Sequence, residues 1–139
     1  MNLFVAGFIG SPQMNFMDVQ IQSEGGKLYA VMPGAKLLVP DAKVNALKPY
    51  VGKTVTMGLR PENFLPASEA KEENVITAKV DFCELLGAET NLYLYVNDTK
   101  VIVKMPSSEP HPVDDVIKVP ANMARAHFFD KDTELAICH

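Results

Sequence analysis

Glu84 and Glu89 are a pair of carboxylates separated by the short sequence Leu-Leu-Gly-Ala. Two carboxylates held close together can divide the acid and base roles of a hydrolytic or transfer reaction. The glycine between them, Gly87, favours a sharp bend because it adopts positive φ without strain. We therefore interpret Glu84 and Glu89 as solvated or interface carboxylates, in preference to a catalytic pair. The run from Glu84 to Thr90, with Gly87, is a candidate for protein contact or for strand-end geometry.

A second charged group, Arg60 and Glu62, directly follows a strand-like run over residues 53–59. Pro61 separates the two side chains and sets the direction in which the chain leaves the strand. An arginine and a glutamate so placed can form a charge-assisted contact with each other or with a partner protein. Two interpretations stay open: a salt-bridged strand end, and an interface to which Gly58 also belongs.

The histidines and cysteines do not have the spacing of a metal site. His111, His127 and His139 are not spaced from each other or from cysteines as zinc ligands usually are. Cys83 lies in a strand-like run, where a small buried apolar residue is expected, and Cys138 lies beside the C-terminus. Two widely spaced cysteines are typical of reduced thiols in a cytosolic protein.

Signatures of catalysis and cofactor binding are missing from the sequence. It has no glycine-rich loop ending in Gly-Lys-Ser or Gly-Lys-Thr, and no Gly-x-Ser-x-Gly nucleophile elbow. We therefore predict no catalytic, cofactor-binding or metal-binding residue in this chain, and no enzymatic activity of its own.

The composition is that of a soluble folded domain. The chain has 139 residues, of which 47% are hydrophobic and 22% are charged, and its formal net charge is −4. Nucleic-acid binding draws on clustered lysines and arginines, so this charge argues against it. No stretch approaches the roughly 18 apolar residues that span a bilayer. A cytoplasmic location is expected.

A two-residue alternation of apolar and polar side chains dominates the chain. Successive side chains of a strand point to opposite faces, so this alternation predicts half-buried strands. In residues 75–82 one face is expected to carry Ile76, Ala78, Val80 and Phe82. Similar alternation occupies residues 17–22, 53–59, 91–96 and 101–105.

Turn residues and prolines separate these runs and leave little room for helix. Glycine or Asn-Asp pairs at 25–26 and 97–98 predict tight hairpins. Helical turns are expected over residues 41–48, capped by Asp41, and 121–126, and residues 2–8 are a candidate for the tail of a helix that Gly10 and Pro12 end. The sequence predicts an all-β fold, an OB-fold-like small barrel. A polar break at 69–74 allows two lobes, 17–59 and 75–137.

Four stretches, taken in order, resemble one family, the regulatory domains of maltose-type and glycerol-phosphate-type ABC importers. Residues 4–16 resemble the junction that follows the ATPase domain in these proteins. Residues 60–62 resemble their Arg-Pro-Glu motif, although Asn63 stands where the family often has histidine. Residues 84–90 resemble their Glu-x-Leu-Gly-x-Glu-Thr segment, and residues 127–137 their closing hairpin. Residues 64–74 and 106–118 carry no resemblance.

The resemblance implies a TOBE or OB-fold-type domain at the C-terminus of an ATP-binding subunit that powers sugar uptake. Residues 1–16 would be the tail of a linker from an absent ATPase domain, and 17–139 the regulatory barrel. ATP and magnesium would bind only that absent domain. The parent subunit is expected to form a homodimer on the cytoplasmic face of two membrane permeases. In some members the regulatory end also receives inhibitory or transcriptional proteins.

Two other functions stay open. Similar small β-domains hold molybdate-like oxyanions, for which Ser11, Thr90 and Lys104 are candidates. An OB-fold can also bind nucleic acid by stacking bases on aromatic side chains, for which Tyr29 and the pair Tyr93 and Tyr95 are candidates. The acidic net charge makes nucleic acid the least favoured partner, and none is predicted.

Overall fold

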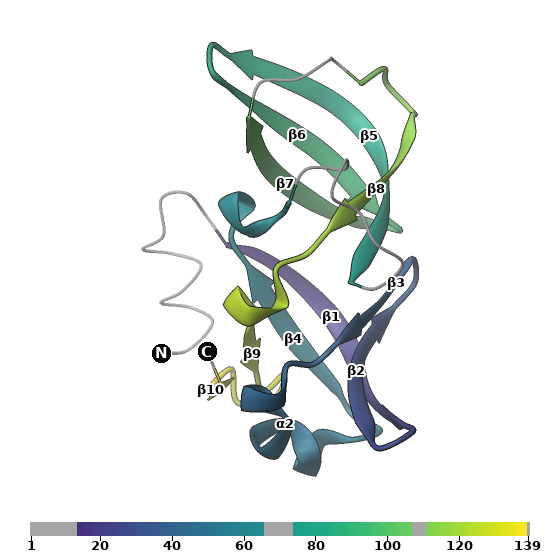
Figure 1. Ribbon diagram of the computed structural model, residues 1–139, viewed down its shortest axis with the longest axis vertical. Coiled ribbons are helices and arrows are strands. Elements are labelled where there is room, and N and C mark those ends of the chain that lie inside the picture. Colours follow the sequence, from purple (N-terminus) through teal and green to yellow (C-terminus); the bar gives the residue numbers. More distant parts are fainter. Residues whose placement is uncertain (1–13, 66–73, 107–110, 139) are drawn as a thin grey trace.

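A computed structural model describes residues 14–65, 74–106 and 111–138 of the chain (Figure 1). Most of the regular structure in these ranges is strand, so the all-β prediction is confirmed. The strands are β1 (Asn15–Glu24), β2 (Lys27–Met32), β3 (Ala35–Leu38), β4 (Thr54–Leu59), β5 (Val75–Leu86), β6 (Glu89–Val96), β7 (Thr99–Pro106), β8 (Val116–Pro120), β9 (His127–Phe129) and β10 (Ala136–Cys138). The helical segments are α2 (Asp41–Leu47) and the short 3-10 turns η1 (Lys48–Tyr50), η2 (Pro61–Asn63) and η4 (Met123–Arg125).

The first lobe consists of β1 to β4, α2, β9 and β10, and occupies the lower half of Figure 1. β1 is its central strand and pairs antiparallel with both β2 and β4. Met17, Val19 and Ile21 are at most 1% exposed, whereas the intervening Asp18 and Gln20 face solvent. The alternation read in the sequence therefore corresponds to an inner and an outer face of this strand.

The second lobe consists of β5 to β8 and occupies the upper half of Figure 1. β5 is long enough to serve two partners: its first half pairs with β8 and its second half with β6. β6 and β7 form a hairpin paired along its whole length, with Asn97 at positive φ in the predicted two-residue turn. The prediction of two lobes is therefore consistent with the structure.

The two lobes are joined through a narrow strand contact. β3 pairs with β5 only where Ala35 lies opposite Ile76, and the backbone N–H of Thr77 donates to the Gly34 oxygen over 2.9 Å. A single cluster of buried apolar side chains nevertheless runs through both lobes. The hydrogen-bonded strand order is β10-β9-β4-β1-β2-β3-β5-β6-β7, with β8 added on β5.

The composition of the lobes differs from the sequence prediction at the C-terminus. The predicted second half, residues 75–137, does not stay together, because β9 crosses back to pair with β4 of the first lobe. Phe128 and Phe129 of β9 are 0% exposed there. β4 has an edge that its sequence neighbours do not cover, and pairing with β9 satisfies that edge.

Phe82 also departs from prediction, because β5 contains a bulge. Val80 pairs with Leu94 and Phe82 with Tyr93, so Asp81 is an extra residue without a counterpart on β6. Phe82 is consequently turned outward and is 46% exposed. Cys83 takes the inward position and packs against the core, as expected of a small apolar residue.

The short helical turns lie where they were expected, and residues 2–8, the candidate helix tail, lie outside the described residues. α2 begins at Asp41, but its N-cap is Pro40 and no side chain caps it, so the capping role predicted for Asp41 is wrong. η4 falls within the predicted 121–126 turn. The boundary predicted between a linker tail (1–16) and the barrel (17–139) stays a prediction, although β1 already begins at Asn15. Among the described helices, none combines the length and apolarity needed to cross a membrane.

Candidate functional site

The Glu84–Thr90 motif forms the tip of the β5–β6 hairpin, at the end of the second lobe farthest from the first (Figure 1). Leu86 pairs with Glu89, so Gly87 and Ala88 are a two-residue turn. Gly87 has φ +68°, and glycine at the first position of such a turn matches the right-handed twist of the two strands. The bend predicted at Gly87 is confirmed.

The two carboxylates of this tip have separate partners. Glu84 Oε1 accepts hydrogen bonds from Asn91 Nδ2 at 3.2 Å and from the Tyr93 hydroxyl at 3.3 Å. Glu89 instead forms an ion pair with Lys104 Nζ over 3.3 Å. Both carboxylates are exposed. This arrangement is that of surface residues, in agreement with the preference for interface or solvated carboxylates.

An apolar patch lies beside these charges. Phe82 stacks on Tyr93 with ring centroids 4.1 Å apart and an interplanar angle of 11°. Leu86, nearer the tip on the same face, is 51% exposed, and Leu85, which pairs with Thr90 on the opposite face, is 58% exposed. A depression of about 350 Å³ opens between the stacked rings and β7, lined by Asp81, Phe82, Tyr93, Leu94, Lys100, Val101 and Ile102. Exposed apolar groups with a charged rim are typical of protein contact surfaces.

Gly58 occupies a crowded position in the second predicted group. It lies in β4, opposite Phe16 of β1 and His127 of β9. A Cβ atom at Gly58 would collide with the sulfur of Met14 and come within 3.2 Å of Phe129 Cε2. Gly58 is therefore required for close packing inside the first lobe, and it is buried in this chain.

Arg60, Pro61 and Glu62 form the exit from β4. Pro61 is the buried first residue of η2, and the backbone N–H of Asn63 donates to the Arg60 oxygen over 2.9 Å. Within the described part of the chain, no ion pair joins Arg60 to Glu62. The salt-bridged strand end therefore lacks its predicted contact, whereas exposed Glu62 leaves an interface role open.

The two predicted groups do not form a single site. η2 packs against β7 near the junction of the lobes, whereas the Glu84–Thr90 hairpin extends from the opposite end of the second lobe (Figure 1). The two motifs follow one another in the sequence, but they do not lie close together in the structure. Of the two, only the hairpin tip presents exposed apolar side chains together with charges.

The residues nominated for an oxyanion do not converge. Thr90, also a candidate contact residue, is only 2% exposed and so does not lie on the hairpin surface. It faces Met105 on the buried side of the sheet, and its hydroxyl has no hydrogen-bond partner among the described residues. Lys104 pairs with Asn91 one position along, so its side chain lies on the opposite face. Ser11, the third candidate, lies outside the described residues. Thr90 and Lys104 therefore cannot grip one anion together.

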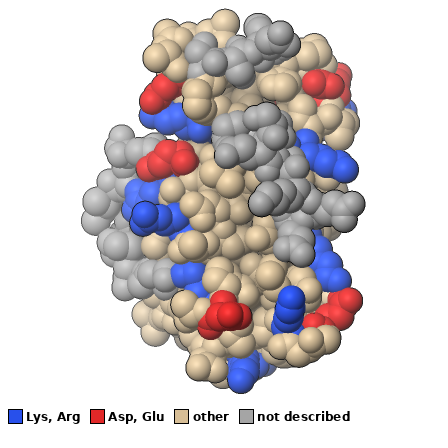
Figure 2. All heavy atoms as spheres, in the orientation of Figure 1, with Lys and Arg blue, Asp and Glu red and all other residues tan. Residues whose placement is uncertain are grey.

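The nominated tyrosines are also distributed over both lobes. Tyr93 and Tyr95 share the outer face of β6, as expected, but the Tyr93 ring is already stacked on Phe82. Tyr29 lies on β2 of the first lobe, under the ammonium group of Lys36 at 4.7 Å. Figure 2 shows basic and acidic side chains mixed on the visible face of the molecule.

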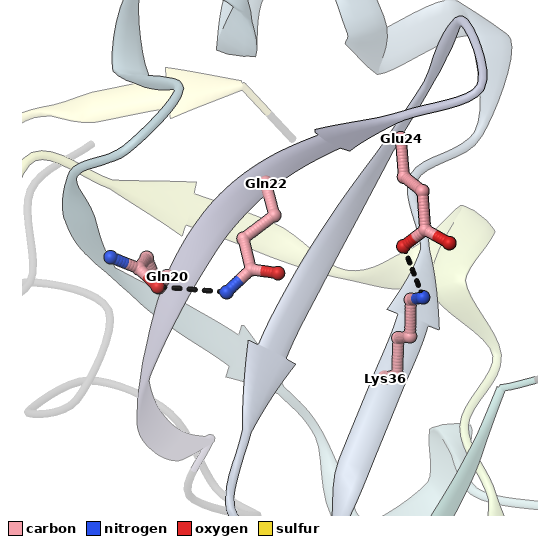
Figure 3. Close-up of polar contacts among 4 residues, drawn as sticks. All are labelled: Gln20, Gln22, Glu24 and Lys36. Atoms are coloured by element: carbon pink, nitrogen blue, oxygen red, sulfur yellow. Dashed lines mark hydrogen bonds and ion pairs between the residues drawn. The ribbon is translucent and has the colours of Figure 1, made fainter.

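The outer face of the first lobe carries a row of polar contacts (Figure 3). On β1, Gln22 Nε2 donates to Gln20 Oε1 at 2.8 Å, and Glu24 binds Lys36 of β3 at 2.5 Å. The hydrogen bond to Glu24 is the main cause that raises the pKa of the exposed Lys36 ammonium. These contacts cross the β1–β2–β3 sheet on its solvent side, where the partly exposed Tyr29, Val31 and Leu38 also lie.

Asp130 organises the turn between β9 and β10. Its Oδ1 accepts the backbone N–H groups of Asp132 at 2.9 Å and Thr133 at 3.0 Å, and its Oδ2 accepts the Tyr50 hydroxyl at 2.9 Å. These bonds, the one from Thr133 above all, lower the pKa of the Asp130 carboxyl below its ordinary value of 3.8. The same contact with Asp130 raises the pKa of Tyr50.

The two cysteines and His111 take ordinary positions, and His139 lies outside the described residues. Cys83 and Cys138 are free thiols, in different lobes. Burial raises the pKa of the Cys138 thiol. His111 Nδ1 lies 3.6 Å from the Asp115 carboxylate. Across the described residues, no group of three or more potential metal-ligating side chains comes together.

Two features of the structure were not anticipated from the sequence. The buried amide of Asn15 bonds to Ile102 in β7, and the β5 bulge creates the exposed Phe82–Tyr93 stack. The sequence contained a signal for the second feature. If Phe82 faces outward, residues 82, 84 and 86 share one face, and this face matches the one that carries residues 89, 91 and 93. No local signal marks Asn15.

Comparison with known families divides the chain into two overlapping parts. Residues 10–64 match the MalK OB fold domain, and residues 57–129 match the TOBE domain. The first match covers β1 to β4 and η2, and the second runs from β4 through the second lobe to β9.

Similar proteins are ATP-binding proteins of ABC transporters. The uncharacterized ABC transporter ATP-binding protein YcjV of Escherichia coli O6:H1 is 41% identical over 99% of this chain and 37% of its own length. The multiple sugar-binding transport ATP-binding protein MsmK of Streptococcus mutans is 37% identical over 98% of this chain. The oligosaccharides import ATP-binding protein MsmX of Bacillus subtilis is 36% identical over 98% of it. The chain spans 37 or 38% of the length of these relatives.

A solved structure has a similar fold at low sequence identity. The cytoplasmic molybdate-binding protein ModG matches with a TM-score of 0.56 and 13% identity, over 84% of this chain and 94% of that one. At this identity the likeness concerns the fold alone.

Proposed function

The chain belongs to the TOBE domain family, and from this premise we propose that it is the regulatory and dimer-forming region of a carbohydrate ABC transporter's ATP-binding subunit. In this role the chain carries no catalytic residue, and ATP and magnesium bind elsewhere in the parent subunit. The proposal rests first on the two family matches, which follow one another along the chain as OB fold and TOBE domain.

The transported substrate class is proposed from the relatives. MsmK is named for multiple sugar-binding transport and MsmX for oligosaccharide import, and each is similar to nearly all of this chain. By the same reasoning, the parent subunit works with membrane permeases, at the cytoplasmic face of the membrane. A regulatory protein as a further partner belongs to the proposal as well.

The observation that supports a contact role is the surface at the β5–β6 hairpin. Leu86 projects from its tip on the face of the stacked Phe82 and Tyr93, and Leu85 projects from the opposite face, each with more than half of its surface exposed. Acidic Glu84 and Glu89 lie along this surface, and basic Lys100 and Lys104 lie on the adjoining β7. A surface with both signs of charge around an apolar centre can complement a second copy of itself across a twofold axis.

A chimera tests the function as a transporter component. The region of Bacillus subtilis MsmX that matches this chain is replaced by the chain, and oligosaccharide uptake is measured in cells that lack MsmX. We expect uptake well above that of cells carrying MsmX with the region deleted. Uptake no higher than in the deletion strain, with the chimera expressed at the MsmX level, would reject the proposal.

Sedimentation velocity tests the dimer and its surface. We expect the chain to self-associate with rising concentration, and the double variant Leu85→Glu/Leu86→Glu to remain monomeric. The matched control is Val113→Glu, which charges a residue that is 64% exposed outside the hairpin. Equal association of all three proteins would exclude this hairpin as the dimer surface.

The oxyanion alternative is tested on the same preparation by calorimetry with molybdate and sulfate. Because Thr90 and Lys104 lie on opposite faces of the sheet, we expect no saturable heat. Saturable binding in the micromolar range would favour an oxyanion-binding function over the contact role.

A further inference from the structure

Asn15, the first residue of β1, has a buried amide side chain and is only 8% exposed. Asn15 Nδ2 donates to the backbone oxygen of Ile102 at 2.8 Å, and the backbone N–H of Ile102 donates to Asn15 Oδ1 at 2.8 Å. An amide side chain carries one carbonyl oxygen and an NH₂ group. It therefore offers Ile102 the same donor and acceptor that the backbone of a neighbouring strand would offer.

Ile102 lies in β7, which is the last strand of the hydrogen-bonded order. In an antiparallel strand the N–H and C=O groups of one residue point to the same side, and those of its neighbours point to the other. Since both groups of Ile102 meet Asn15, they point away from β6. Such edge groups normally form hydrogen bonds with water or with a strand of another molecule.

The contact connects β7, the last strand of the second lobe, back to β1 of the first. The order β1-β2-β3-β5-β6-β7 leads from the first lobe into the second, and the Asn15 side chain returns it from β7 to β1. The only strand pairing between the lobes along this path is the short one between Ala35 and Ile76, among the described residues. The lobes also meet where η2 packs on β7, at the bridge between Phe64 and Ala121 and in the shared apolar cluster. The two Asn15 bonds add a contact that ties the outer edge of β7 to the start of β1.

We propose that Asn15 is a clasp, a positioning residue that holds the edge of β7 against the start of β1 and thereby sets the orientation of the second lobe on the first. It acts through its two hydrogen bonds to Ile102. The inference is independent of the transport role, because it concerns only how the two lobes of this chain are held together.

A direct test uses the unaltered chain in solution. A scalar coupling through the hydrogen bond is measured between the Ile102 amide nitrogen and the side-chain carbonyl carbon of Asn15 by NMR. Detection of this coupling supports the clasp. Its absence, in a spectrum that shows the corresponding couplings between β6 and β7, overturns it.

Variants test whether the contact orients the lobes. In Asn15→Ala we expect the Ile102 amide to exchange with solvent about tenfold faster or more. The amides of Val101 and Val103, which point to β6, should keep their protection. Residual dipolar couplings of both lobes should fit one alignment tensor in the wild type and require two in the variant. The matched control is Asn91→Ala, which removes an amide that, within the described ranges, bonds Glu84 on the outer face.

Two results would overturn the proposal. One is equal acceleration of Val101, Ile102 and Val103, which signals a general loss of stability. The other is a single alignment tensor in Asn15→Ala. If that variant does not fold, Asn15→Asp is used, in which a carboxylate oxygen replaces the donor facing the Ile102 carbonyl. A single tensor in Asn15→Asp would equally reject the clasp.

Discussion

Gly58 shows how one missing side chain can determine the packing of a lobe. Met14 and Phe129 form a small buried cluster, and both approach the place where a Cβ atom at Gly58 would lie. The backbone of Gly58 pairs on both sides, with Phe16 and His127, so it has little room to retreat. In this chain the glycine of the Gly58–Glu62 motif is explained by packing, without reference to a partner.

We expect Gly58→Ala to destabilise the chain by about 1–3 kcal/mol, the usual cost of overpacking a well-filled core. Met14→Ala alone should cost about 2–5 kcal/mol, because it leaves a cavity. The double variant should be less destabilised than the sum, since removal of the Met14 side chain makes room for the new methyl group. Urea unfolding of the four proteins measures the coupling, and strictly additive values would contradict this account.

Asp130 makes the stability of the β9–β10 turn depend on pH. The folded-state pKa of its carboxyl is lowered, so its hydrogen bonds stabilise the fold above the ordinary value of 3.8. That contribution is lost as the pH falls through the lower, folded-state pKa. We expect the difference in unfolding free energy between wild type and Asp130→Asn to be largest near neutral pH and to shrink below the ordinary pKa.

The control for this titration is Asp132→Asn, which removes an exposed charge from the same turn and keeps the backbone N–H that bonds Asp130. Thermal unfolding followed from acid to neutral pH provides the measurement. If Asp132→Asn reproduced the pH profile of Asp130→Asn, the effect would be one of net charge and not of the Asp130 hydrogen bonds.

At the scale of elements, the β5–β6 hairpin combines a tight turn with a bulge. Gly87 adopts positive φ at the tip, and the extra residue Asp81 turns Phe82 to the outside. The tip therefore has a fixed geometry although its side chains are exposed. A surface with a fixed backbone loses less conformational entropy when a partner binds it.

We expect Gly87→Ala to lower the stability of the chain by about 1–2 kcal/mol, the cost of left-handed backbone for a residue with a Cβ atom. Apart from the two chain neighbours, no atom of the described residues lies within 4 Å of the added group, so steric contact does not contribute. Gly87→Asn should cost less, because asparagine tolerates this conformation better. Chemical denaturation compares them, and equal costs for alanine and asparagine would show that the backbone conformation is not the cause.

At the scale of the whole molecule, the C-terminal hairpin determines which residues form each lobe. β9 joins β4, so residues from the two ends of the described chain make up the first lobe, while β5 to β8 form an insertion between them. Phe128 is fully buried at this junction, whereas Phe82 is 46% exposed in the second lobe. The two phenylalanines provide a matched pair for measuring what the return of the chain contributes.

We expect Phe128→Ala to destabilise the chain by about 3–5 kcal/mol, as is usual for a buried phenylalanine. Phe82→Ala should cost much less, because its ring is largely exposed. In Phe128→Ala, the backbone amides of β1 and β4 should exchange with solvent at shorter times than those of β6 and β7. Earlier exchange in the second lobe would mean that the hairpin supports that lobe instead.

Local patterns in the sequence were sufficient to predict the all-β class, the tight turns and the short helices. Alternating burial and turn chemistry depend on neighbours along the chain, so Met17, Val19 and Ile21 and the Gly87 turn could be interpreted without a structure. The same local logic correctly placed Glu84 and Glu89 at the surface and Cys83 against the core.

Only the tertiary structure decided which elements meet. Three features illustrate this: the pairing of β9 with β4, the outward turn of Phe82 at the bulge, and the bond between Asn15 and Ile102. The first and third join residues that are distant in sequence, and the second depends on a break in the strand register. Such contacts depend on which strand edges and buried polar groups stay unsatisfied once the local elements have formed. That information belongs to the assembled sheet and is not written in any short segment of the chain.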